Sequence, residues 1–172
     1  MKRKDEKVKD GALAALYVGI LLASAYFVPA VWAFLENRLS WHSLLPQLLA
    51  LFLFALSAKL LFREPFRIPY FLAVALLFFY AMSRLELPVE RIHFIEYGTL
   101  SFFLFRVLRH FFRVPWSFIG SALIASGIGV IDELLQGLLP NRTYDTRDLW
   151  INFFSASLGM LVVATWVTPR SF

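Results

Sequence analysis

Polar and ionisable side chains stand in a few short stretches of this chain, inside otherwise apolar runs. The first stretch, ERIHFIEYGTL, carries His93, Glu96 and Tyr97 at positions i, i+3 and i+4. On a helix, this spacing puts the three side chains on one face. A histidine beside a carboxylate is the combination used in general acid–base catalysis, and both groups also bind polar ligands. We therefore take His93 and Glu96 as candidate catalytic residues.

Further polar residues lie in GVIDELLQGLLPNRTYDTRDLWIN, residues 129–152. Asp132 and Gln136 share a helical face at i, i+4, and Glu133 lies beside Gln136 at i, i+3. A last stripe repeats at intervals of four, three and four residues, at Asp148, Asn152, Ser155 and Gly159. A charge in lipid costs roughly 2.5–3.5 kcal/mol on insertion scales, so these residues should face a bundle interior and pair or hydrate.

The elements that must position these residues are predicted from apolar length. Of the 172 residues, 59% are hydrophobic, and the mean hydropathy of +0.66 is too high for an ordinary soluble domain. The apolar residues also come in blocks long enough to cross a bilayer. We predict an all-α, polytopic transmembrane helical bundle of about six spans, at residues 11–35, 44–62, 68–82, 92–112, 116–139 and 149–167. Pro29, inside the first span, predicts a kink.

The distribution of basic residues predicts the orientation. With a cytoplasmic N-terminus, 12 of the 17 Lys and Arg residues fall on the cytoplasmic side, and every inner loop is basic. The net charge of +5 then reflects membrane orientation, and we expect no nucleic-acid partner. The predicted organisation is a charged, solvated cytoplasmic head over residues 1–10, a bundle over residues 11–167 and a short tail over residues 168–172.

Two further expectations concern residues outside the polar stretches. We expect His42 and His110 to be solvated. We also expect a basic cluster at the inner end of the fourth span to meet anionic lipid headgroups, namely Arg106, Arg109, His110 and Arg113. The absence of cysteine excludes disulfides, thiolate catalysis and zinc–thiolate sites.

In this topology, the polar faces of the last three spans meet at the depth of the outer leaflet. One reading is a site that binds or modifies an anionic or sugar-bearing envelope lipid. Arg142 and Arg147 would then hold phosphate or carboxylate groups. Tyr97, Tyr144 and Trp150 would supply aromatic faces, although an interfacial aromatic belt explains single residues of this kind equally well.

Other readings stay open. An intramembrane hydrolase or transferase would use Glu133 or His93 as general base, with Arg142 steadying a developing anion. Proton- or ion-coupled transport is a further reading, although polar residues thin out toward the inner half. A structural bundle would use Asn152, Gln136 and one acid–Arg pair only as interhelical hydrogen-bond glue. We expect no cofactor and no metal.

The candidate residues follow from these readings. The catalytic candidates are His93, Glu96 and Glu133. The binding candidates are Tyr97, Asp132, Gln136, Arg142, Asp145, Arg147, Asp148 and Asn152.

The same residues carry a family resemblance. ERIHFIEYGTL is similar to the HF-x-EY signature of the VanZ-like membrane proteins, matched by His93, Phe94, Glu96 and Tyr97. Their second signature is matched in order by Glu133, Gln136, Pro140, Arg142, Asp145, Asp148, Asn152 and Gly159. The match covers about residues 90–160, the VanZ-like core. Many relatives carry Asp-Lys ahead of the histidine, where this chain has Val89-Glu90-Arg91.

This resemblance implies a multi-pass protein of the bacterial cell membrane, of the kind linked to low-level resistance to teicoplanin-type glycopeptides. It implies no settled reaction, and a housekeeping role in the cell envelope fits it equally well. The partners we expect are membrane lipids, including a lipid-linked envelope precursor.

Overall fold

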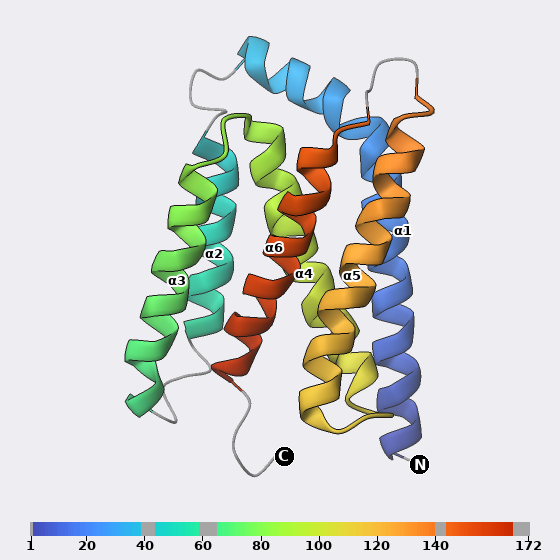
Figure 1. Ribbon diagram of the computed structural model, residues 1–172, viewed down its shortest axis with the longest axis vertical. Coiled ribbons are helices and arrows are strands. Elements are labelled where there is room, and N and C mark those ends of the chain that lie inside the picture. Colours follow the sequence, from blue (N-terminus) through green and yellow to red (C-terminus); the bar gives the residue numbers. More distant parts are fainter. Residues whose placement is uncertain (1, 39–43, 59–64, 140–143, 167–172) are drawn as a thin grey trace.

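The computed structural model describes residues 2–38, 44–58, 65–139 and 144–166, which are entirely helical apart from turns. Six α-helices and one 3-10 turn follow in the order α1 (Lys2–Arg38), α2 (Leu45–Ala58), η3 (Pro65–Arg67), α3 (Ile68–Ser83), α4 (Pro88–Leu108), α5 (Val114–Gln136) and α6 (Thr146–Ala164). The six helices run alternately up and down, and both chain ends lie at the same end of the bundle (Figure 1).

Each predicted span corresponds to one helix of the described chain, but the six helices differ in length and apolar character. Helices α1 and α5 are long and apolar enough to cross a membrane by themselves, whereas α2 and α3 are apolar but shorter. Part of the predicted second span, residues 59–62, lies outside the described residues. The all-helical prediction is therefore confirmed, and six crossings stay a prediction.

Helix α4 begins and ends four residues earlier than predicted. Pro88 lies in its first turn, where proline is tolerated because the first amides have no helical partner. The Glu90 carboxylate accepts a hydrogen bond from the Leu87 amide at 3.1 Å, which fixes the start. At the other end, the amides of residues 110–112 bond to carbonyls in a tight turn. These local bonds outweigh the apolar run used to place the span.

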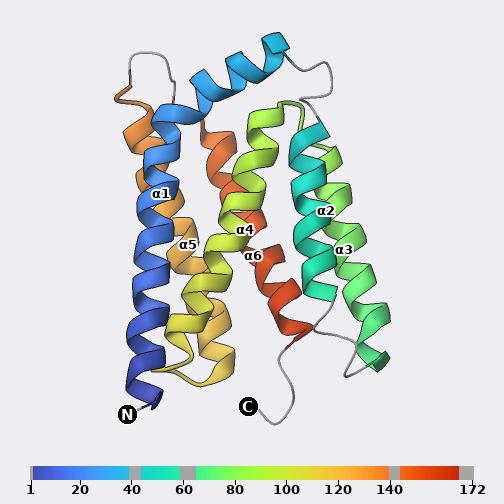
Figure 2. The same ribbon diagram turned by 180° about the vertical axis from the view of Figure 1, so that it is seen from behind.

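Helix α1 is one continuous helix that includes most of the predicted head. Residues 4–9 are exposed, but they continue the helix without a boundary at residue 10. Pro29 lies inside α1. The last part of the helix, in lighter blue, bends over and crosses the end of the bundle opposite the termini (Figures 1 and 2). The predicted kink is thus present.

Helix α4 lies at the centre of the bundle, in contact with α1, α2, α5 and α6. Its closest approach is to α6, where a Cβ atom on Gly159 would lie only 2.5 Å from the Gly98 carbonyl oxygen. Only glycine allows two helix backbones to come this close. Because of this contact, residues on facing turns of α4 and α6 meet directly.

The prediction that His110 is solvated is wrong, and the prediction that the basic cluster meets lipid headgroups stays a prediction. His110 is not solvated: its Nε2 lies 2.9 Å from the Asp10 carboxylate, and only 13% of its side chain is exposed. Arg106 donates to the other oxygen of Asp10. These three residues form an ion cluster that ties the start of α1 to the end of α4. Burial of Asp10 explains the difference, because a buried carboxylate needs hydrogen-bonding partners and His110 is one of them. His42 lies outside the described residues.

Candidate functional site

The sequence-predicted polar residues of α4, α5 and α6 lie close together at the end of the bundle opposite the termini. We call them the polar cluster: His93, Glu96, Tyr97, Asp132, Glu133, Gln136, Asn152 and Ser155. All but Glu96 are buried, and Tyr97, Glu133, Asn152 and Ser155 are fully so. The chain brings them together because α4 and α6 start at this end while α5 finishes there.

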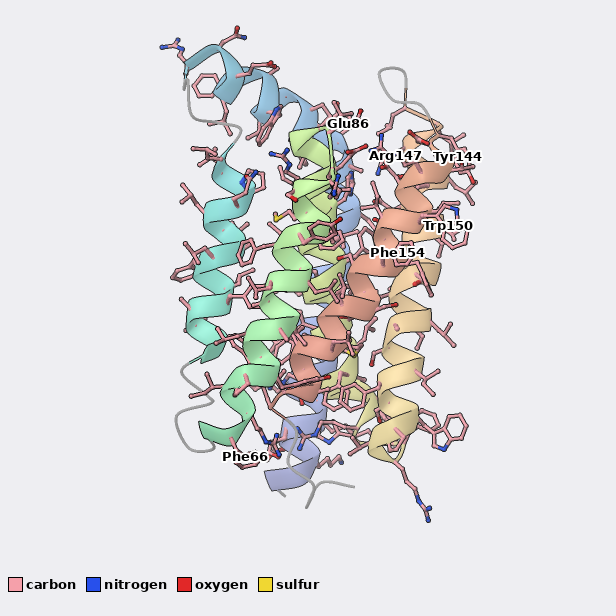
Figure 3. The ribbon with its side chains drawn as sticks, turned by 60° about the vertical axis from the view of Figure 1, so that its left-hand side comes forward. Phe66, Glu86, Tyr144, Arg147, Trp150 and Phe154 are labelled. Atoms are coloured by element: carbon pink, nitrogen blue, oxygen red, sulfur yellow. The ribbon has the colours of Figure 1, made fainter. Side chains whose placement is uncertain are left out.

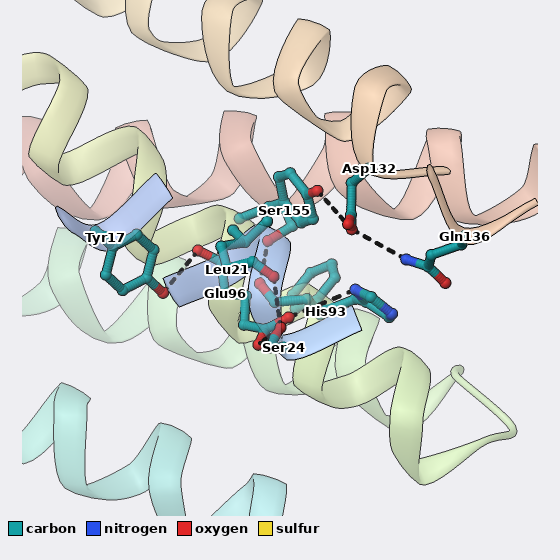
Figure 4. A network of polar contacts seen from close by, with 10 residues as sticks. Tyr17, Leu21, Ser24, His93, Glu96, Asp132, Gln136 and Ser155 are labelled. Atoms are coloured by element: carbon teal, nitrogen blue, oxygen red, sulfur yellow. Dashed lines mark hydrogen bonds and ion pairs between the residues drawn. The ribbon is translucent and has the colours of Figure 1, made fainter. Parts of the chain in front are cut away.

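Asp132 joins α4 to α5 within the cluster. Its Oδ2 accepts a hydrogen bond of 3.0 Å from the Tyr97 hydroxyl and another of 3.0 Å from the Gln136 side-chain amide (Figure 4). The first bond links two helices, whereas the second stays within α5. Among the described residues, Gln136 therefore bonds within its own helix and supports Asp132, and no interhelical bond of Gln136 is found there. Ser155 of α6 provides a second link, since its hydroxyl donates to the Phe94 carbonyl.

The candidate catalytic pair on α4 also contacts α1. His93 Nδ1 lies 3.5 Å from Glu96 Oε2, and Glu96 Oε1 accepts a hydrogen bond of 3.2 Å from the Ser24 hydroxyl (Figure 4). Tyr17 donates to the Glu96 main-chain carbonyl at 3.1 Å. Sequence reasoning missed Ser24 and Tyr17. Ser24 could have been noticed as a polar residue within the first apolar run. It also lies two helical turns from Tyr17, on a similar face of the helix.

Glu133 is fully buried and uses only one of its carboxylate oxygens. Its Oε2 accepts a hydrogen bond of 3.2 Å from the Asp145 amide, while its Oε1 forms none with the residues that the structure describes. Asp132, Asp145 and Asp148 lie near enough to act electrostatically on it. A hydrogen-bond donor from a bound group would satisfy Oε1.

Asn152 is the least engaged side chain of the cluster. Both atoms of its amide group are buried, and neither forms a hydrogen bond within the described ranges. A Cβ on Gly129 would lie 2.9 Å from its Nδ2, so this glycine lets α5 approach the amide closely. A buried polar group without a partner costs about 1–3 kcal/mol. Asn152 therefore does not act as interhelical glue through a described neighbour, contrary to that reading.

The connecting segment before α6 carries several predicted binding residues. Asp145 caps α6, with its side chain accepting from the Arg147 amide at 2.8 Å. The Arg147 guanidinium lies 3.3 Å from Glu90 and 4.0 Å from Glu86, so it pairs α6 with the start of α4. Asp148 is half-buried. Arg142 lies outside the described residues.

Two aromatic residues proposed as ligand contacts do not lie in the cluster. Tyr144 and Trp150 are 45% and 64% exposed, and Figure 3 shows the Trp150 ring pointing outward from α6. The Trp150 ring packs beside Phe154 and Phe153, with ring centroids 6.2 and 6.3 Å away. This exposed placement favours the interfacial belt. Tyr97, in contrast, is buried inside the cluster.

The polar cluster contains mainly hydrogen-bond acceptors and a side-chain amide, and fewer cationic groups. Within the described part of the chain, no three His, Asp or Glu side chains are placed to hold a metal ion. Arg147 and Arg91 bond to acids and to a main-chain carbonyl, respectively. Oε1 of Glu133 and the Asn152 amide are the groups most suited to binding hydroxyl or amine groups of a ligand.

Comparison with known proteins gives one match. A family model described as VanZ/LLP1 matches residues 12–167, which is nearly the whole chain. The match extends beyond the predicted core of residues 90–160 to α2, α3 and most of α1. Neither a curated protein nor a solved structure matches the chain.

Proposed function

Because the chain belongs to the VanZ/LLP1 family, we propose that it is a multi-pass protein of the bacterial cell membrane in which all six helices cross the bilayer. The alternating helix directions support this proposal (Figure 1). So do the many large apolar side chains on the outer surface, such as Phe52, Leu76 and Leu123, which are 63%, 71% and 60% exposed. A soluble protein rarely exposes so many large apolar side chains on its surface.

In this membrane the polar cluster lies toward the outer leaflet, and its function is to bind the headgroup of an envelope lipid. One observation carries the proposal: Glu133 Oε1 and both Asn152 amide atoms are buried without a hydrogen-bond partner among the described residues. Polar atoms used only to hold helices together would be engaged with a neighbouring helix, as Tyr97 and Ser155 are. Glu133 and Gly129 are one turn apart on α5, and Gly129 lies against the Asn152 amide of α6. A ligand group is the fitting partner for the three unused atoms.

Of the two headgroup chemistries expected, a sugar-bearing headgroup fits the cluster better than an anionic one. A carboxylate oxygen and a side-chain amide form hydrogen bonds with sugar hydroxyls, which both donate and accept. Phosphate would instead face the carboxylates of Asp132 and Glu133 and repel them. Arg147, the described cation nearest the α6 start, already pairs with Glu90.

The test is lipid selectivity of the purified protein. The protein is placed in phosphatidylcholine nanodiscs containing equal amounts of glucosyl diacylglycerol and phosphatidylglycerol, and the retained lipids are identified by native mass spectrometry. We expect enrichment of the glucosyl lipid, and an Asn152→Ala variant should lose about tenfold in preference, the loss of one good hydrogen-bonding group. Equal retention of both lipids by the wild type would overturn the proposal.

A second candidate function is acid–base catalysis on a lipid-linked substrate. The close contact of His93 with Glu96, together with the buried Glu133, favours it, since these groups hold and transfer protons. Incubation with a lipid-linked sugar and separation of the products tests this role. Product formed by the wild type and lost in Glu133→Gln would establish it, whereas unchanged substrate leaves binding as the function.

A role in glycopeptide sensitivity follows if the bound lipid is a cell-wall precursor. Expression of the wild type in a sensitive bacterium should then raise the teicoplanin concentration needed to stop growth. The variants Glu133→Ala and Asn152→Ala, at equal membrane abundance, should not. If the variants raise this teicoplanin concentration as much as the wild type does, any resistance effect does not depend on the polar cluster.

A further inference from the structure

An apolar groove lies beside the polar cluster and has no role in the function described so far. Its volume is about 410 Å³, and its walls come from α2, α3, α4 and α6. Thr99 is the only hydroxyl-bearing residue in its lining, which otherwise consists of apolar side chains and glycines such as Phe54, Ile95, Gly98 and Val162. This size falls within the roughly 300–1000 Å³ of ordinary ligand pockets.

The groove is partly open and not an enclosed cavity. Seen from behind, α1 and α2 stand apart, with α4 and α6 between them, and the bent end of α1 crosses above (Figure 2). Ile95, Gly98, Thr99 and Phe102 follow the groove along two turns of α4. Gly159, Val162 and Val163 follow it along α6, and Trp166 lies just beyond the end of that helix. In a bilayer, this opening faces hydrocarbon and not water.

The outer end of the groove adjoins the polar cluster. Ile95 lines the groove while the next residue, Glu96, belongs to the cluster with 19% of its side chain exposed. A Cβ on Gly98 would lie 3.4 Å from the Ser155 hydroxyl, which places that polar residue directly behind the groove floor. Phe78 of the groove wall packs on Phe94, with ring centroids 4.8 Å apart. Polar and apolar binding surfaces thus follow each other along α4.

We propose that the groove between α2, α4 and α6 holds a hydrocarbon chain of the lipid whose headgroup binds in the polar cluster. This inference rests on the proposed function and narrows it: the ligand is an amphiphile recognised by both of its parts, and a soluble sugar would bind only weakly. The close contact of Gly98 with Gly159 sets the depth of the groove floor, because a larger residue at either position would separate α4 from α6.

A matched pair of variants tests the groove. Val162→Phe adds a ring inside the groove, and Val130→Phe makes the same change on α5 at a side chain that is 43% exposed. Retention of glucosyl diacylglycerol in phosphatidylcholine nanodiscs should fall about tenfold or more with Val162→Phe, since excluding about two methylenes suffices for that loss. Val130→Phe should behave as wild type. Wild-type retention by Val162→Phe would overturn the proposal.

A second measurement needs no variant and therefore does not depend on folding of the substituted protein. Glucosyl diacylglycerol with a photoreactive diazirine in one acyl chain is irradiated with the wild-type protein in the same nanodiscs. Cross-links should map to peptides containing Thr99, Phe102 or Val162, in excess of those from phosphatidylcholine with the same chain. Equal labelling by the two lipids, or labelling confined to other helices, would contradict the groove assignment.

The two proposals fail in different ways. If Asn152→Ala removes the preference for the sugar headgroup while Val162→Phe changes nothing, the polar cluster is the site and the groove is not. If Val162→Phe lowers retention while Asn152→Ala retains full headgroup preference, the groove binds a chain and the headgroup assignment is wrong.

Discussion

The two ends of the bundle both bury charged residues, but they use them differently. At the end with the termini, both carboxylate oxygens of Asp10 are occupied, one by Arg106 and one by His110. At the opposite end, Glu133 leaves one oxygen without a described partner, and Asn152 leaves its whole amide so. The hydrogen bonds of the Asp10 carboxylate are therefore satisfied within the protein, whereas Glu133 and Asn152 have polar atoms that form no hydrogen bond with the described chain.

This difference separates structural polar residues from candidate binding residues. Composition alone does not make the distinction, since both clusters contain a histidine and acids within apolar helices. The number of polar atoms that form hydrogen bonds makes the distinction, because a polar group that stabilises the fold must have its hydrogen-bond partner within the fold. Within the polar cluster itself, Tyr97 belongs to the first kind, since its hydroxyl is bonded to Asp132, and Asn152 belongs to the second.

The largest effect on stability is expected at Asp10. Asp10→Asn removes the negative charge that Arg106 and His110 share, and breaking a buried ion pair costs about 3–5 kcal/mol. We expect about 3 kcal/mol, the lower end, because 36% of the Arg106 side chain is exposed. Thermal unfolding in detergent measures the change. Asp5→Asn, at an exposed position of the same helix, is the control and should be neutral.

A smaller loss is expected for Tyr97→Phe. This change removes the only described link between Tyr97 and Asp132 and leaves a buried carboxylate with fewer donors, at a cost of about 1.5–3 kcal/mol for a bond to a charged group. The same unfolding assay applies, with Tyr26→Phe at a 67% exposed position as control. Unchanged stability would show that Asp132 is not held as the structure has it.

Asn152→Ala sharpens the comparison because it should affect binding but not stability. The unfolding free energy should change by less than about 1 kcal/mol, since the lost packing is offset by removing two unmatched polar atoms. Retention of glucosyl diacylglycerol should nevertheless fall. A loss of stability comparable to that of Tyr97→Phe would place Asn152 among the structural residues.

The smallest effect is expected for Trp150→Ala. Its side chain is 64% exposed and lies on the outer face of α6, away from the polar cluster. Surface substitutions usually change stability by less than about 0.5 kcal/mol. Both unfolding and lipid retention should match wild type. A large loss of retention would return Trp150 to the binding site and weaken the assignment to an interfacial belt.

Helical periodicity and apolar length were enough to predict six helices and the shared end of the polar residues. Both signals are local, and the alternation of helix directions then places the starts of α4 and α6 beside the end of α5. What they did not give was the pairing between distant helices. Nothing near Asp10 in the sequence indicates Arg106, which is 96 residues away, and likewise Ser24 carries no local sign of its contact with Glu96.

The sequence also could not predict which side-chain atoms form hydrogen bonds, because local patterns do not specify contacts between distant helices. Asn152 and Gln136 share the same chemistry, and both were candidates for interhelical bonds. Gln136 bonds one turn back along its own helix, while Asn152 lies against Gly129, which has no side chain to meet it. The groove, too, depends on the spacing between α2 and α4, which no local pattern specifies.

The most direct measurement is the shift in unfolding temperature that glucosyl diacylglycerol causes in three proteins: wild type, Asp10→Asn and Asn152→Ala. A ligand that binds the folded state raises its stability by an amount set by its affinity. We predict the same upward shift for wild type and Asp10→Asn, despite their different starting stabilities, and little or none for Asn152→Ala. An equal shift in all three proteins would contradict a headgroup site at the polar cluster.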